Sequence, residues 1–98
     1  MALEIYWTKK ADKSFSGIVD YLESKWGEKS VIIFIRKTYL MLDLLSEFPE
    51  IGTIEFKSLN IRGLLLVRQI RLFYQIRDKK IILLNFYDNR QNPQKRKY

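Results

Sequence analysis

Five arginines lie along residues 61–93, where apolar runs alternate with short polar breaks. They are Arg62, Arg68, Arg71, Arg77 and Arg90. A guanidinium group stays charged and offers a planar fork of N–H donors, which suits phosphate or carboxylate groups. Apolar runs bounded by turn residues are typical of sheet strands, and a sheet would hold the arginines in fixed positions. The pattern therefore predicts a rigid cationic surface that meets an acidic partner.

The positive charge is concentrated in the second half of the chain. Residues 1–54 hold seven Lys or Arg against eight Asp or Glu, whereas residues 55–98 hold eleven against three. Such an asymmetry indicates nucleic acid or an acidic protein as the partner. The alternative is a solvated basic surface that only keeps the protein soluble.

Two missing residue types limit the chemistry, because the chain has no cysteine and no histidine. Disulfides, thiol nucleophiles and a histidine base are therefore excluded, and we expect no metal site and no cofactor. No apolar run reaches the roughly eighteen residues that a membrane span needs. The N-terminus lacks the charge pattern of a signal peptide, so we expect a cytoplasmic protein that makes no contact with a membrane.

The first half of the chain predicts a strand followed by two helices. Residues 3–8 are rich in aromatic and β-branched side chains, and Thr8 can cap the helix that follows. Apolar residues then recur at helical spacing until Gly27, a natural C-terminal cap. A second helix is expected over 28–47, ending before Pro49. This helix has more apolar residues than one face needs, so the surplus packs against the first helix or against a partner protein.

The second half predicts a sheet. A short strand is possible over 54–59, and the main strands are expected at 63–67, 70–77 and 80–87, followed by a basic tail over 88–98. In the middle strand, alternation directs Ile70, Leu72, Tyr74 and Ile76 toward the helices and Arg71, Phe73, Gln75 and Arg77 away from them. The expected fold class is α+β. It has an N-terminal strand and a two-helix hairpin packed on one face of a small antiparallel sheet, in the order β-α-α-β-β-β.

Several of these segments resemble the RelE/ParE superfamily of bacterial toxins, and the resemblance covers nearly the whole chain. It rests on the helical hairpin YLESKWG…LSEFPEIG, the strand IRLFYQI and the following IILLNFYDNRQNP. Its most specific part is Arg71 to Tyr74 followed by Arg90. The resemblance implies a single toxin domain over 1–98 from a type II toxin–antitoxin module, with growth inhibition and plasmid stabilization as its effects. It also implies a cognate antitoxin that masks the basic surface in a hetero-oligomer.

Two branches of this superfamily act on different targets. ParE-like toxins inhibit DNA gyrase, whereas RelE-like toxins enter the ribosome and cut mRNA, using lysines on the strand before the tyrosine strand together with arginines. Arg71 and Arg90 match those arginine positions and would be the catalytic residues of a RelE-like enzyme. The strand GLLLV over 63–67 carries no lysine, so such an enzyme would lack its usual base unless Lys57 or a tyrosine replaces it. The sequence therefore favours the ParE-like branch and keeps the RelE-like ribonuclease as the alternative.

The remaining candidate residues would bind the partner. They are Arg62, Arg68, Arg77, Lys57, Phe73 and Tyr87. An acidic antitoxin segment would suit a basic surface near Phe73 and Phe86. The alternative interpretation of Arg71 and Arg90 is a structural ion pair with Asp88 or Glu55.

Overall fold

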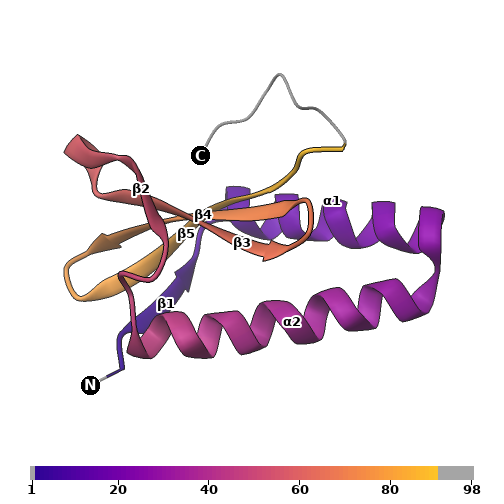
Figure 1. Ribbon diagram of the computed structural model, residues 1–98, viewed down its shortest axis with the longest axis horizontal. Coiled ribbons are helices and arrows are strands. Elements are labelled where there is room, and N and C mark those ends of the chain that lie inside the picture. Colours follow the sequence, from indigo (N-terminus) through magenta and orange to yellow (C-terminus); the bar gives the residue numbers. More distant parts are fainter. Residues whose placement is uncertain (1, 91–98) are drawn as a thin grey trace.

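The computed structural model describes residues 2–90, which form two helices and a five-stranded sheet (Figure 1). Along the chain the elements are β1 (Glu4–Trp7), α1 (Lys9–Trp26), α2 (Glu28–Glu47), β2 (Thr53–Phe56), a 3-10 turn over Lys57–Leu59, β3 (Ile61–Val67), β4 (Ile70–Arg77) and β5 (Lys80–Asp88). In this part of the chain, no helix is long and apolar enough to cross a membrane.

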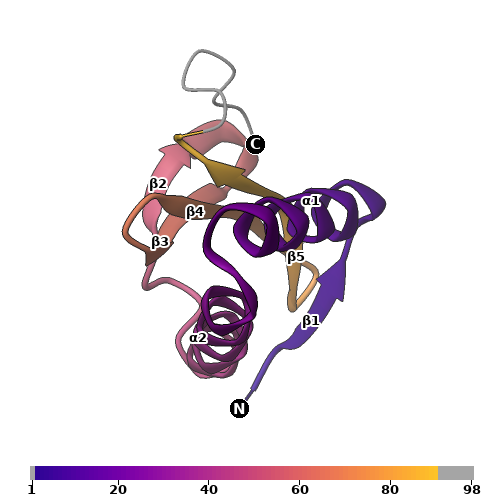
Figure 2. The ribbon, with the colours of Figure 1, turned by 90° about the vertical axis from the view of Figure 1, so that its right-hand side faces the viewer.

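The two helices begin and end where the sequence predicts. The Thr8 hydroxyl accepts a hydrogen bond from Ala11 N at 3.0 Å, which satisfies one of the unpaired donors at the start of α1. Gly27 ends α1 with φ +89°, a left-handed conformation that glycine adopts without strain. A single residue thus separates α1 from α2, and Figure 2 shows α2 nearly end-on with α1 beside it.

The strands lie in the order β1-β5-β4-β3-β2, so β4 is the central strand, with β5 on one side and β3 on the other. Neighbouring strands are antiparallel except for β1 and β5, which run parallel with Ile5 beside Ile81. The expected α+β fold, with a helical hairpin on a mostly antiparallel sheet, is confirmed, and the parallel pairing of β1 with β5 is the exception to antiparallel order in this sheet. Parallel neighbours need a long crossover connection, and here the helices and the intervening strands supply it.

The helical hairpin covers one face of the sheet. A core of aliphatic and aromatic side chains fills the space between the two layers, and Ile70, Leu72 and Tyr74 contribute to it from β4. Trp7 stacks on Phe86 with 5.3 Å between the ring centroids, which joins β1 to β5. Ile70, Leu72 and Tyr74 are fully buried, as the predicted alternation of the middle strand requires, whereas Ile76 is half-buried. Phe73, predicted to point away from the helices, is also buried, with 2% of its surface exposed.

Strand bounds differ from the prediction mainly at β2. The possible strand over 54–59 is a shorter strand, Thr53–Phe56, followed by the 3-10 turn that ends at Asn60 in a left-handed conformation. The β4–β5 hairpin turns at Asp78 and Lys79, both with positive φ, as a two-residue hairpin loop requires. The predicted tail beyond Arg90 lies outside the described residues.

We expect Thr8→Val to lower the free energy of unfolding by about 1–2 kcal/mol. The substitution keeps the shape of the side chain but removes the α1 cap, and it also removes the bond that the hydroxyl donates to Leu83 O at 2.7 Å. Chemical denaturation would measure the change. Ser24→Ala, at an exposed position of α1, is the control and should stay within about 0.5 kcal/mol of the wild type. Equal losses in both variants would contradict the role given to Thr8.

Candidate functional site

The face of the sheet that looks away from the helices carries the candidate residues of β4, and we call it the open face. Its members share one side of the sheet by alternation and by cross-strand register: Arg71, Phe73, Gln75 and Arg77 of β4, Ile61, Gly63 and Leu65 of β3, and Lys80, Ile82, Asn85 and Tyr87 of β5. The open face is therefore a mixture of cationic, amide, aromatic and aliphatic groups at fixed spacing.

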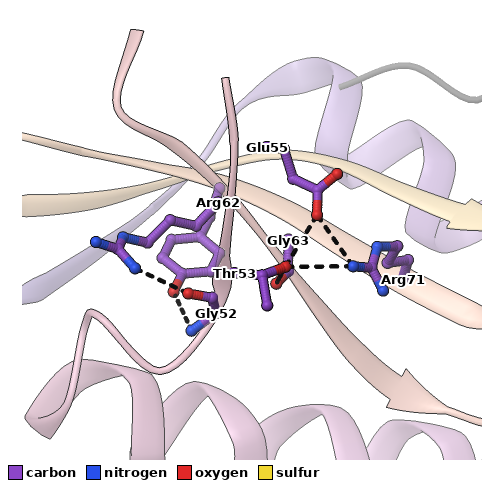
Figure 3. Close-up of polar contacts among 7 residues, drawn as sticks. Gly52, Thr53, Glu55, Arg62, Gly63 and Arg71 are labelled. Carbon is purple, nitrogen blue, oxygen red and sulfur yellow. Dashed lines mark hydrogen bonds and ion pairs between the residues drawn. The ribbon is translucent and has the colours of Figure 1, made fainter. Parts of the chain in front are cut away.

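Arg71 on the open face forms an ion pair inside the protein. Its Nη2 lies 3.0 Å from the Glu55 carboxylate and 3.4 Å from the Thr53 hydroxyl, and the Thr53 hydroxyl also donates to Glu55 (Figure 3). Both charged side chains are about four-fifths buried. Gly63 makes the pairing possible, because a Cβ there would lie 3.0 Å from Glu55 Cγ. The alternative interpretation of Arg71 as a structural ion pair with Glu55 is the one that the structure shows.

Arg62 lies on the other side of the sheet. It is the cross-strand neighbour of Tyr74 and therefore faces the helices. Its Nη1 donates to Gly52 O at 2.8 Å (Figure 3) and also to Glu50 O at 3.1 Å. These two hydrogen bonds hold the loop between α2 and β2. The Arg62 guanidinium thus binds backbone carbonyl groups of its own chain.

Tyr74 of β4 binds the same loop through its hydroxyl group. Its hydroxyl donates to Pro49 O at 2.7 Å and accepts from Gly52 N at 2.9 Å. The side chain is fully buried, and this burial raises the pKa of the phenol, while the hydrogen bond from Gly52 and the charge of Arg62 act in the opposite direction. A buried phenol with a raised pKa and two backbone partners is a structural group rather than a proton donor for a substrate.

Arg90 follows β5 and is bound by the carboxylate of Asp88. Its Nη2 and Nε lie 2.9 Å and 3.1 Å from the two carboxylate oxygens, and its guanidinium lies 5.8 Å from the centroid of the Tyr21 ring on α1. The hydrogen bonds that the guanidinium donates to Asp88 raise the pKa of Arg90, so the guanidinium stays charged. Asp88 is 2% exposed, and its carboxylate accepts hydrogen bonds from the backbone N–H and the guanidinium of Arg90.

The structure does not bring Arg71 and Arg90 to one place. Arg71 lies on the open face, whereas Arg90 lies beside α1 on the helix side and lines a groove of about 240 Å³ with Leu22 and Phe34. Arg68 and Trp26 lie on the rim of the same groove. The two arginines that would act together in a RelE-like ribonuclease therefore occupy opposite sides of the sheet.

The more exposed cationic candidates lie at the periphery. Arg77, at the end of β4, has a side chain that is 66% exposed and a distant partner, Asp78, at 3.8 Å. Lys80 begins β5 beside it, and Arg77 and Lys80 line a second groove of about 170 Å³. Lys57 is exposed in the 3-10 turn. These groups, unlike Arg62 and Arg71, are available to a partner.

The aromatic candidates are covered. Phe73 is 2% exposed and Tyr87 is 8% exposed, and Phe86 lies in the core on the helix side. Ile54 of β2 and Leu65 of β3 are at least half exposed, as is Tyr6 of β1 at the opposite edge of the sheet. The sequence did not predict this exposure because it could not place β1 and β2 at the sheet edges. Within residues 2–90, no three acidic side chains gather closely enough to hold a metal ion.

The family model described as "ParE toxin of type II toxin-antitoxin system, parDE" matches residues 5–93. The chain therefore belongs to the ParE toxin family and is a ParE-like toxin of the type II toxin–antitoxin class. No curated protein matches the chain.

Solved structures agree with this assignment at the level of the fold. A chain of the chromosomal ParDE toxin–antitoxin system from P. aeruginosa is similar with a TM-score of 0.73 and 18% identity, over 89% of this chain and 96% of that one. A copper-bound mutant toxin from Helicobacter pylori is similar with a TM-score of 0.56 and 17% identity, over 92% of this chain and 98% of that one. The superfamily resemblance and its ParE-like branch are thereby confirmed.

We expect Tyr74→Phe to lower the free energy of unfolding by about 1–3 kcal/mol, because it leaves the buried Gly52 N–H and Pro49 O without the phenol. The cost should shrink above pH 10. Above pH 10 the unfolded wild type loses the proton of the Tyr74 phenol, whereas the folded protein retains it because its pKa is raised. Rising pH therefore destabilises the wild type through this group, which the variant lacks. Denaturation of both proteins between pH 8 and 11 would measure this. Tyr39→Phe, at a half-exposed ring, is the control, and a loss that does not change with pH would contradict the argument.

Glu55→Gln should uncover the charge of Arg71 and raise the affinity of the protein for a single-stranded RNA oligonucleotide several-fold at low salt. Fluorescence anisotropy would measure the affinity. Glu50→Gln is the matched control, because it removes the same charge from a side chain that is 79% exposed. The Glu50 carboxylate lies 3.7 Å from the Arg62 guanidinium, farther than the 3.0 Å between Glu55 and Arg71. An equal gain in both variants would mean that net charge, and not the release of Arg71, sets the affinity.

Proposed function

We propose that this ParE-like toxin inhibits DNA gyrase and that a cognate antitoxin neutralises it. Membership of the ParE toxin family over residues 5–93 supports the toxin part of the proposal. The choice of gyrase over the ribosome rests on one observation: Arg71 and Arg90 are each bound to a carboxylate of the same chain and lie on opposite sides of the sheet.

A ribonuclease that works without metal or histidine needs a base and several cations around one phosphate. In this chain the strand β3 carries one basic residue, Arg62, which faces the helices and binds the loop at Gly52. Tyr74 is buried with both of its hydrogen bonds made to backbone groups. No cluster suited to cutting RNA is therefore assembled on the open face of the described chain, which supports binding rather than bond cleavage as the toxic activity.

The partner surface follows from the groups that remain exposed. Arg77, Lys79 and Lys80 lie together at the β4–β5 turn, and β2 adds the exposed side chain of Phe56, which shares the open face through its pairing with Ile61. A surface of this composition suits an acidic, partly apolar segment, and the edge strand β2 has one side without a neighbouring strand. We propose an antitoxin segment of that chemistry, in a toxin–antitoxin hetero-oligomer.

Purified protein should block the supercoiling of relaxed plasmid by DNA gyrase, and addition of the antitoxin encoded beside it should restore supercoiling. The double variant Arg77→Glu/Lys80→Glu should lose most of the inhibition, because it reverses two exposed charges at the end of the open face. Lys9→Glu/Lys13→Glu is the matched control, with the same change of charge at exposed positions of α1, and should inhibit like the wild type.

Unaffected supercoiling at a large molar excess of toxin would overturn the gyrase proposal. Primer extension on translated mRNA separates the RelE-like alternative. New RNA ends that disappear in both Arg71→Ala and Arg90→Ala would establish that alternative in place of ours.

A further inference from the structure

One side of α2 exposes a regular row of side chains, which we call the α2 stripe. It consists of Ile33, Lys37, Leu40, Leu44 and Glu47. Ile33 and Leu40 are each 62% exposed and Leu44 is 43% exposed, although their aliphatic side chains favour burial. Apolar residues in a row along a helix need a covering partner more than single exposed ones do.

The α2 stripe follows the spacing of a coiled-coil seam. Its members recur at alternating steps of four and three residues, so they line one side of the helix for about four turns. The buried residues of α2, which include Phe34, Leu42 and Leu45, point into the core. The α2 stripe therefore faces away from the rest of its own molecule.

We propose that the α2 stripe binds the α2 stripe of a second copy of this chain, with the two helices antiparallel. In this arrangement Leu40 packs against Leu44 of the second copy, and Leu44 against Leu40 of the second copy, at the centre of the interface. On either side, Lys37 lies opposite Glu47 of the second copy. The two-fold symmetry repeats each contact, as in an isologous dimer.

The charges of α2 select this arrangement. A parallel pair would place Lys37 against Lys37 and Glu47 against Glu47, and like charges repel. Shifting the antiparallel pair by about one turn, so that Leu40 faces Leu40, would bring Ile33 opposite Glu47. Of these three arrangements, only the proposed register pairs Leu40 with Leu44 and Lys37 with Glu47, while Ile33 lies past the end of α2 of the second copy. The stripe is therefore complementary to itself.

The same self-complementarity favours a second copy over an unrelated partner. Basic residues lie in the middle of α2, with Arg36 beside Lys37, and acidic residues lie in its last part, with Asp43 before Glu47. An acidic partner segment would meet Asp43 and Glu47 as repulsive groups. Because α2 lies on the helix side of the sheet, the dimer leaves the open face of both copies uncovered (Figure 1). The inference goes beyond the proposed function and does not depend on it.

Sedimentation equilibrium of the full-length toxin without antitoxin tests the dimer. An interface of one helix pair is smaller than a standard protein interface, so we expect association at roughly 10–100 µM. Lys37→Glu and Glu47→Lys should each weaken it at least tenfold, because each places like charges opposite one another. The double variant Lys37→Glu/Glu47→Lys exchanges the two charges and should restore the dimer.

Lys13→Glu is the matched control, since it makes the same change at an exposed position of α1 and should associate like the wild type. Circular dichroism of each variant checks that the fold is retained. A wild type that stays monomeric at several hundred micromolar would overturn the proposal. So would a dimer that Lys37→Glu leaves intact, or a double variant that stays monomeric, since either outcome would leave the α2 stripe to the antitoxin or to another protein.

Discussion

A partly buried guanidinium must find acceptors inside its own fold, because burying an unpaired charge costs more than a small domain can tolerate. Arg62, Arg71 and Arg90 are partly buried in this way, and each contacts a segment that is separate from it in the sequence. Arg62 binds the loop before β2, and Arg71 on β4 binds Glu55 on β2. Arg90 binds Asp88 at the end of β5 and lies over Tyr21 of α1. The edge strand, the loop after α2 and the end of the sheet are therefore held in place by arginines.

This internal use of charge shapes what the surface can do. The arginines at the positions that a ribonuclease would use are neutralised by Glu55 and Asp88, whereas the side chains around the β4–β5 turn remain exposed. The two layers also present different surfaces: the sheet side offers a cationic margin and an edge strand, and the helix side offers an apolar seam with alternating charges. In the two proposals above, the sheet side binds the target or the antitoxin, and α2 binds a second copy of the chain.

Most of the local structure could be predicted from the sequence because its causes are local. The apolar spacing of three and four residues, the Thr8 cap and the Gly27 break define both helices to the residue. Alternation along Ile70–Arg77 identified which side chains of β4 enter the core, because successive side chains of a strand point to opposite faces. The resemblance to RelE/ParE toxins at residues such as Arg71 and Arg90 indicated the toxin family. It did not give the positions of these side chains in the fold.

The sequence by itself thus determined the elements, the face of β4 that is buried and the two acidic residues that could neutralise Arg71 and Arg90. Only the tertiary structure decided which carboxylate meets which arginine, that β1 runs parallel to β5, and that Arg62 faces the helices. The physical reason is the range of the interactions. Helix caps and alternation act between neighbours in the chain, whereas strand register and ion pairs such as Arg71–Glu55 join residues whose proximity exists only after the sheet has formed.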